Sequence, residues 1–214
     1  MLFCPSLYAV VDAEICARAG RDPADIARAL IDAGVRLLQV RGKGLGGAAL
    51  LALSRQVVGD GPETRVIVND RPDIALLADA GGVHIGQDDL SADDARRIVG
   101  TARWVGVSTH SVEQAQRALD EPIDYLAVGP VFETGTKDTG YAAVGVGLVR
   151  AVSALARPRG VPVVAIGGIT LDRAAETIEA GASSVCVISD LFTGDPGARA
   201  AAYVRRLGPQ VNGT

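Results

Sequence analysis

Short apolar runs rich in β-branched residues recur along the chain, and longer stretches with a helical period separate them. Each run is nearly continuous in its apolar character, which is typical of strands buried on both faces. We expect eight strands, at residues 7–11, 37–40, 65–68, 82–85, 104–107, 125–128, 162–166 and 184–188. Apolar residues at helical spacing predict helices over residues 22–34, 47–58, 72–79, 91–99, 111–119, 147–156, 170–180 and 196–207.

Strands that alternate with helices predict a parallel sheet covered by helices. Eight such units in 214 residues fit the α/β class as a small (β/α)8 barrel, or TIM barrel, forming a single domain over residues 1–214. An open, doubly wound sheet is the alternative. We expect residues 208–214, which follow the last helical stretch, to form a frayed tail.

Composition disfavours several classes of protein. A hydrophobic content of 48% argues against disorder, and a net charge of −4 with 4% aromatic residues argues against a nucleic-acid partner. No apolar run approaches the roughly 20 residues of a membrane span, and the first residues lack the basic start of a signal peptide. Three scattered cysteines fit a reducing compartment. We therefore expect a cytoplasmic protein that acts on small molecules, without a membrane partner and with homo-oligomerisation open.

The second predicted strand ends in alternating polar residues. In a barrel of this kind the active site lies at the carboxyl ends of the strands. Gln39, Arg41 and Lys43 would share one side if the strand extends that far. A guanidinium and an ammonium together suit a polyphosphate, and Lys43 is one of only two lysines in the chain. A solvated basic turn is the plainer interpretation.

The third and fourth strands lead into acidic residues. Asp70 follows Asn69, and Asp89 lies in the next loop, so the two carboxylates could share Mg²⁺, which prefers few protein oxygens together with phosphate and water. Alternatively, Asp70 caps the helix at Pro72, and Asp88 or Asp89 caps the helix near residue 91. His84 is either a core histidine or a substrate contact.

The remaining strand ends suggest a second phosphate site. Ser108 ends the fifth strand, and the loop after the sixth is the longest, about 17 residues, as binding loops often are. Gly168 and Ser189 follow the seventh and eighth strands, where such barrels often bind phosphate. One diphosphate and one separate phosphate are therefore expected, either on two phosphorylated substrates or at the two ends of one long bisphosphate. The sequence shows no serine–histidine or cysteine–histidine pair for nucleophilic catalysis, so ionisation of a diphosphate leaving group is favoured.

An ordered set of motifs resembles the thiamine-phosphate synthase (thiamine-phosphate pyrophosphorylase) family over nearly the whole chain. The motifs are LYAVVD, QVRGK, VNDRPDIAL, GVHIGQDDL, GVSTH, DYLAVGPVF, TGTK, VVAIGGI and GASSVCVIS. Such transferases use Mg²⁺ and join 4-amino-2-methyl-5-(diphosphooxymethyl)pyrimidine to 4-methyl-5-(2-phosphoethyl)thiazole or its carboxylated form. The products are thiamine phosphate and pyrophosphate, formed through a dissociative step.

The resemblance implies a role for each matching residue. The pyrimidine diphosphate would contact Gln39, Arg41, Lys43, Asn69, Ser108 and Lys137. Asp70 and Asp89 would bind Mg²⁺. The thiazole phosphate would contact Thr134, Thr136, Gly168, Ile188 and Ser189.

Three positions depart from the family pattern. Gly42 replaces a usual glutamate, Glu133 a usual proline, and Asp190 a usual small residue. None of the three is one of the expected ligands.

Three rival functions remain open. A related thiazole tautomerase has a histidine where this chain has Pro130. A non-catalytic phosphate-binding barrel would not need both lysines and both aspartates. An unrelated barrel isomerase would share only the phosphate features after the last two strands.

Overall fold

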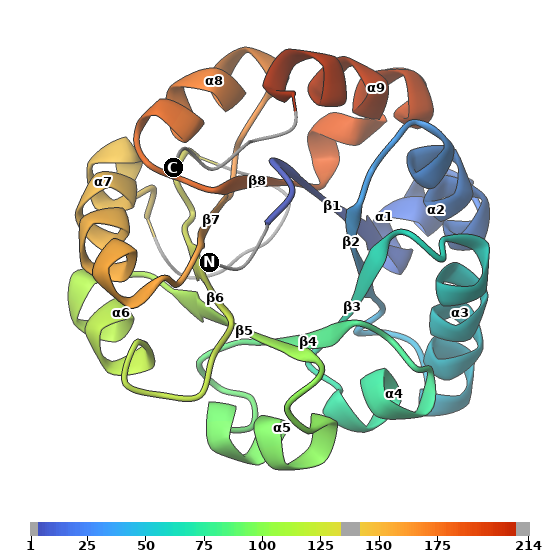
Figure 1. Cartoon of the computed structure of the whole chain (residues 1–214). Helices are drawn as coiled ribbons and strands as arrows, with labels where there is room; N and C mark the ends of the chain where they lie inside the picture. Colours follow the sequence, from blue (N-terminus) through green and yellow to red (C-terminus); the bar gives the residue numbers. More distant parts are fainter. Residues whose placement is uncertain (1–3, 134–141, 209–214) are drawn as a thin grey trace.

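Eight parallel strands close into a barrel, and the helices form a ring around it (Figure 1). The computed structural model describes residues 4–133 and 142–208. The strands follow one another around the barrel in chain order, and β8 pairs back to β1, with Leu7 opposite Val185. This closure confirms the predicted TIM barrel and excludes the open sheet. None of the helices in the described ranges has the length and apolar character that crossing a bilayer requires.

The boundaries of the elements agree closely with the sequence pattern. The strands are β1 (Leu7–Asp12), β2 (Leu37–Arg41), β3 (Arg65–Asn69), β4 (Gly82–Ile85), β5 (Trp104–Thr109), β6 (Tyr125–Val128), β7 (Val163–Ile166) and β8 (Ser184–Val187). The α-helices are α1 (Ala13–Arg18), α2 (Pro23–Asp32), α3 (Gly47–Asp60), α4 (Pro72–Leu77), α5 (Ala92–Val99), α6 (Val112–Ala118), α7 (Gly145–Ala156), α8 (Leu171–Glu179) and α9 (Pro196–Leu207). Two 3-10 helices, η1 (Arg157–Arg159) and η2 (Ser189–Phe192), complete the described part. The expectation of a frayed tail falls almost wholly on residues outside it.

Helix α1 is the main element that the sequence pattern did not predict. Asp12 ends β1, and its carboxylate also accepts hydrogen bonds from the backbone nitrogens of Glu14 and Ile15, at 3.0 and 3.1 Å. An aspartate in this position satisfies the first free amides of a helix. Strand and helix therefore share a boundary residue, which leaves no loop signal between them.

Side chains that alternate along the strands build two apolar layers. In β1, Leu7, Ala9 and Val11 pack outward against the helices, whereas Tyr8 and Val10 point into the barrel. The interior also contains Trp104 and Tyr125. Because side chains alternate with period two, the polar residues at the inner carboxyl ends of the strands face one common space.

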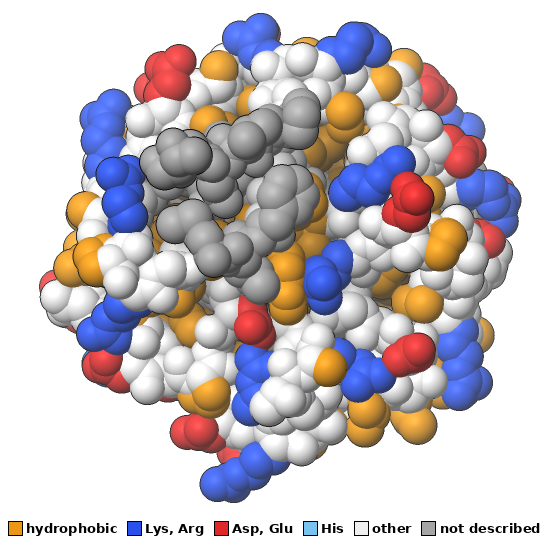
Figure 2. Space-filling view, viewed as in Figure 1, with side chains coloured by type: hydrophobic (Ala, Val, Ile, Leu, Met, Phe, Trp, Pro, Cys, Tyr) orange, Lys and Arg blue, Asp and Glu red, His pale blue; other side chains and the backbone are white. Residues whose placement is uncertain are grey.

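The face of the molecule that Figure 2 shows is mixed in charge. On the face shown in Figure 2, Lys and Arg side chains are interspersed with Asp and Glu side chains around the rim. This interspersion is typical of a solvated protein surface.

Candidate active site

A cavity of about 270 Å³ lies at the carboxyl ends of the strands, where the sequence placed the active site. It brings together the expected ligands from β2 through β5 and one, Ile188, from the end of β8. The expected residues that line it are Gln39, Arg41, Lys43, Asn69, Asp70, His84, Asp89, Ser108 and Ile188. Gly168 and Ser189 are not part of this lining.

Two carboxylates and one ammonium meet at the mouth of this cavity. Lys43 Nζ lies 3.0 Å from Asp70 Oδ2, and Asp89 accepts a 2.7 Å hydrogen bond from the Gly86 amide. Partial burial and the neighbouring Asp70 carboxylate raise the pKa of Asp89, whereas the Gly86 amide and Lys43 lower it. The two like charges are therefore close enough to interact, an arrangement that a shared cation stabilises.

The alternative that these aspartates serve as helix caps is wrong. Arg71 occupies the N-cap of α4 without a side-chain bond, and the Ser91 hydroxyl caps α5. Asp70 instead has a φ of +62°, and its amide donates to the His84 carbonyl at 2.7 Å. This left-handed conformation is uncommon for residues other than glycine. The backbone thus holds the Asp70 carboxylate beside Lys43 and Asp89.

Arg41 is held by a partner that the sequence analysis did not single out. Its guanidinium forms an ion pair with Asp12, and both side chains are largely buried. Strand β2 ends at Arg41, so Lys43 reaches the cavity from the following turn and not from the strand. A guanidinium carries five N–H donors, so the pair with Asp12 fixes its plane and leaves donors for a ligand.

His84 belongs to a polar chain and is not an isolated core histidine. Its Nε2 lies 2.9 Å from Ser108 Oγ, and its Nδ1 lies 3.0 Å from the Tyr125 hydroxyl. Tyr8 and Gln39 continue this chain inside the barrel. Tyr8 and Tyr125 gave no functional signal in the sequence, because an aromatic residue in a strand normally indicates core packing.

Two further polar residues border the cavity. Gln87 donates from Nε2 to the Ser108 carbonyl at 2.6 Å, and His110 Nδ1 lies 2.5 Å from the Gly129 carbonyl. Both line the cavity. The scarcity of histidine, which occurs only at positions 84 and 110, is the sequence signal that could have pointed to His110.

The ends of β7 and β8 form the opposite side of the barrel from the carboxylates. Gly168 has a φ of +65°, and a Cβ there would lie 2.5 Å from the Glu133 carbonyl oxygen. Only glycine fits this position without displacing the backbone. Ile166 pairs with Cys186, so Gly168 and Ile188 follow the two strands at equivalent positions.

Asp190, one of the departures from the family pattern, has a structural role. Its carboxylate accepts hydrogen bonds from the Tyr203 hydroxyl at 2.6 Å, from Arg199 at 3.0 and 3.1 Å, and from the Leu171 amide at 3.3 Å. It therefore ties η2 to α8 and α9. The segment that begins with Ser189 is fixed by these bonds.

Cys186 lines the cavity as an inert thiol. Burial raises the pKa of Cys186 well above its ordinary value. A thiol needs a lowered pKa to act as a nucleophile at neutral pH. The residue therefore contributes apolar surface to the cavity.

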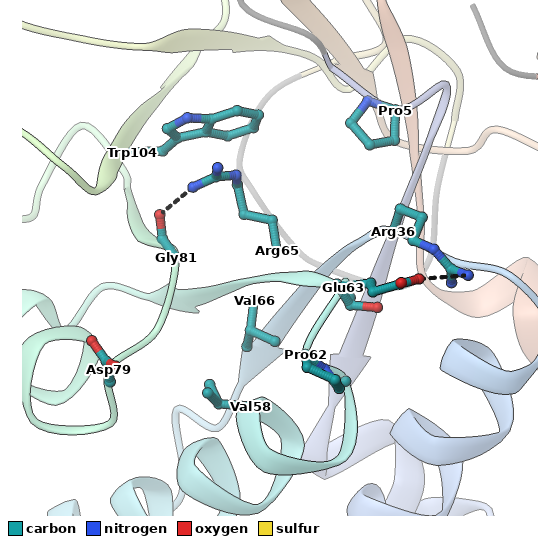
Figure 3. Close-up of a pocket in the computed structure, with 12 residues that line it drawn as sticks. Pro5, Arg36, Val58, Pro62, Glu63, Arg65, Val66, Asp79, Gly81 and Trp104 are labelled. Carbon is teal, nitrogen blue, oxygen red and sulfur yellow. Dashed lines mark hydrogen bonds and ion pairs between the residues drawn. The ribbon is translucent and has the colours of Figure 1, made fainter.

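A second cavity, of about 710 Å³, lies at the amino ends of the strands (Figure 3). The Arg65 guanidinium stacks 4.1 Å from the centre of the Trp104 ring and donates to the Gly81 carbonyl at 3.1 Å. Glu63 at its edge pairs with Arg36 at 3.7 Å. In TIM barrels residues at this end serve stability, and the reaction takes place at the other end.

Comparisons with known proteins decide the family. The sequence model of a family described as thiamine monophosphate synthase matches residues 7–191. The chain belongs to the thiamine monophosphate synthase family. A thiamine-phosphate synthase from Koribacter versatilis is 42% identical over 95% of this chain and 96% of its own length. Another, from Methanoregula boonei, is 41% identical over 92% and 89% of the two chains.

A solved member supports the same placement within thiamine monophosphate synthases. The thiamine phosphate pyrophosphorylase from Pyrococcus furiosus superposes with a TM-score of 0.83 at 27% identity, covering 94% of this chain and 95% of its own. The resemblance carried by the motifs is therefore confirmed. Three expected ligands, Thr134, Thr136 and Lys137, lie outside the described residues.

Proposed function

We propose that this protein catalyses the reaction of its family, joining a pyrimidine-methyl diphosphate to a thiazole phosphate. The observation that carries this assignment is the convergence of Lys43, Asp70 and Asp89 at one cavity mouth. A neutral or apolar substrate would have no use for that cluster. A diphosphate accompanied by a divalent cation matches both signs of charge.

The described residues divide between two substrates. The pyrimidine diphosphate would lie against Gln39, Arg41, Lys43, Asn69 and Ser108, which line one continuous cavity. The thiazole phosphate would lie at Gly168, Ile188 and Ser189, after β7 and β8. In the closed barrel β3 and β4 stand opposite β7 and β8. The two substrates would therefore meet across the barrel mouth.

The donor set fits Mg²⁺. Asp70 and Asp89 would hold the ion as a pair of carboxylates. Residues 4–133 and 142–208 contain no group of three or more His, Cys, Asp or Glu side chains that could form a site built from protein ligands alone. Two carboxylates alone suit Mg²⁺, because this ion keeps water and substrate phosphates among its ligands. When bound, Mg²⁺ would supply positive charge that stabilises the leaving diphosphate.

The side chains would promote heterolysis of one bond and formation of another. The carbon–oxygen bond between the pyrimidine methylene and the diphosphate breaks, and its electron pair leaves with pyrophosphate. Arg41, Lys43 and Lys137 would stabilise the charge that grows on the leaving group. The thiazole nitrogen then uses its lone pair to form the new carbon–nitrogen bond. No nucleophilic side chain takes part, which agrees with the inert Cys186 thiol.

The state of the cysteines bears on the compartment in which the protein works. Cys4, Cys16 and Cys186 are all free and buried. Free thiols support placement in a reducing compartment, and we assign the protein to the cytoplasm on that basis.

The assignment is tested by incubating the purified protein with both substrates and Mg²⁺ and measuring thiamine phosphate by chromatography. Product should form only when both substrates are present. Reactions that omit either one are the matched controls. Conversion of the thiazole phosphate alone to an isomer would instead support a tautomerase, and binding without conversion would support a non-catalytic barrel.

A further inference from the structure

Five buried or half-buried side chains form a continuous hydrogen-bond chain through the barrel interior. Gln39 Nε2 lies 2.8 Å from the Tyr8 hydroxyl, and the Tyr8 and Tyr125 hydroxyls lie 3.1 Å apart. Tyr125 then reaches His84 Nδ1 at 3.0 Å, and His84 Nε2 reaches Ser108 at 2.9 Å. The chain joins β1 and β2 to β4, β5 and β6. Both ends of the chain line the cavity.

The interior is shaped around the central tyrosine of this chain. Tyr125 is completely buried, and its ring stacks on His84 with centres 5.6 Å apart. Gly106 leaves the room for it, since a Cβ at that position would lie 1.9 Å from the Tyr125 ring. Burial raises the pKa values of Tyr8 and Tyr125 well above the ordinary value, so both remain neutral phenols.

The donor and the acceptor of each hydrogen bond can be assigned in turn, starting from Gln39. The Gln39 amide nitrogen only donates, so the Tyr8 oxygen accepts. The Tyr8 proton then points to the Tyr125 oxygen, because a buried hydroxyl proton without an acceptor costs about 1–3 kcal/mol. By the same reasoning Tyr125 donates to His84.

This assignment fixes the tautomer of His84 and the orientation of the Ser108 hydroxyl. In a neutral imidazole whose Nδ1 accepts from Tyr125, the one ring proton is on Nε2, and in His84 that atom faces Ser108 Oγ. The Ser108 hydroxyl proton is then directed away from His84. Had the chain run in the opposite direction, Ser108 would donate to His84 and offer only lone pairs to a ligand.

We infer that Tyr125 and Tyr8 are positioning residues that hold His84 in its Nε2–H tautomer and thereby make Ser108 a hydrogen-bond donor to the diphosphate. An anionic ligand is stabilised by donors and repelled by lone pairs, so the direction of the chain decides whether Ser108 helps or hinders binding. The inference deepens the proposed function and rests on it for the identity of the ligand.

The tautomer can be read directly by ¹⁵N NMR of the imidazole rings in the histidine-labelled protein. Only two histidines contribute signals, and His110 is an internal reference of the opposite kind. Its Nδ1 faces the Gly129 carbonyl, which can only accept, so the His110 proton is on Nδ1. We expect the protonated nitrogen to be Nε2 in His84. A proton on Nδ1 of His84 would overturn the inference, whether or not the protein makes thiamine phosphate.

Variants separate positioning from general stability. Tyr125→Phe should disturb the His84 signals and lower kcat/KM for the pyrimidine diphosphate roughly 10- to 100-fold, as for other partners that orient a binding group. The KM for the thiazole phosphate should not change. Tyr203→Phe removes another buried hydroxyl, which packs in the outer apolar layer and bonds to Asp190, and it should leave the His84 signals unaltered.

A double variant supplies the decisive kinetic comparison. In a Ser108→Ala background, Tyr125→Phe should cause no further loss of kcat/KM beyond about twofold, because its effect passes through Ser108. A full additive loss in the double variant would show that Tyr125 acts by another route and would contradict the inference. Absence of all activity in the wild type would reject the proposed function, while the tautomer measurement would still stand.

Discussion

The ammonium nitrogen of Lys43 lies 3.0 Å from a carboxylate oxygen of Asp70 and joins the turn after β2 to the residue that follows β3. Asp89 adds a second carboxylate beside this pair. One ammonium cannot balance two carboxylates, so the cluster keeps a negative charge that a cation would neutralise. A cation on Asp70 would also release Lys43 to contact a phosphate oxygen.

Removal of one carboxylate should abolish metal-dependent catalysis. We expect Asp70→Asn to lower kcat/KM by at least about 100-fold, since metal ligation is lost while asparagine tolerates the positive φ of this position. Steady-state kinetics with Mg²⁺, and again with chelator, provide the measurement. Asp79→Asn, at another position with positive φ, is the control and should stay within about twofold of the wild type. Wild-type rates for Asp70→Asn would contradict the metal site.

The pH dependence of stability should reveal the repulsion between these carboxylates. The pKa of folded Asp89 lies above its ordinary value of 3.8, so the native state keeps this proton to higher pH than the unfolded state. The resulting stability is present at low pH and is lost as the pH rises through the folded pKa. In chelator, Asp89→Asn should therefore gain Tm relative to the wild type as the pH rises from about 4 to 7.

Expressed as a free energy of unfolding, the gain of Asp89→Asn over the wild type should be below about 1 kcal/mol, because Asp89 is exposed and solvent screens the interaction. Added Mg²⁺ should raise the Tm of the wild type and not that of Asp89→Asn. Thermal unfolding at a series of pH values measures both effects. An equal rise of the two proteins with Mg²⁺ would mean that Asp89 is not a ligand.

The two phosphate sites should separate kinetically. Ser189→Ala should raise KM for the thiazole phosphate more than KM for the pyrimidine diphosphate, and Lys43→Ala should do the reverse. Loss of one hydrogen bond to a charged group corresponds to about 1.5–3 kcal/mol, or about 10- to 100-fold. Bisubstrate kinetics on both variants test the division. Equal effects on both substrates in both variants would exclude it.

Lys137, the second lysine of the chain, should act mainly on the transition state. Negative charge grows on the leaving pyrophosphate as its bond breaks, so Lys137→Ala should lower kcat with a barrier cost of about 2–4 kcal/mol. Lys137→Arg should recover part of the rate, because it keeps the charge and changes its shape. Turnover of Lys137→Ala within about twofold of the wild type would show that the residue is only a solvated loop cation.

The Asp190 contacts should matter for stability. Asp190→Asn leaves Arg199 half-buried without its ionic partner, and we expect the free energy of unfolding to fall by about 2–3 kcal/mol. Urea unfolding measures the change. Arg97→Ala removes an exposed ion pair with Asp94 and should change stability by no more than about 0.5 kcal/mol. Similar values for the two variants would argue against a structural role for Asp190.

The local pattern of apolar and polar residues was enough to predict most of the strands and helices. Each strand was recognisable because a barrel strand is apolar on both faces, as the run of β6, Tyr125–Val128, illustrates. The start of α2 was equally recognisable, since Asp22 caps the helix and Pro23 occupies its first turn. Helix α1 was missed because Asp12 belongs to the end of a strand and to the start of a helix at once.

The site was predictable as a set of strand ends, and its internal contacts were not. Position alone placed Lys43, Asp70 and Asp89 together, because the carboxyl ends of parallel strands meet. The pairing of Arg41 with Asp12 and the path from Tyr8 to Tyr125 depend on which side chains face each other across the barrel. A linear pattern contains no information on that geometry.

The most direct test of the central claim is a count of both products in a single reaction. The wild-type protein, both substrates and Mg²⁺ should yield thiamine phosphate and pyrophosphate in equal amounts, and chelator should stop the formation of both. Pyrophosphate released without thiamine phosphate, or no change in either substrate with the plain and the carboxylated thiazole, would contradict the account.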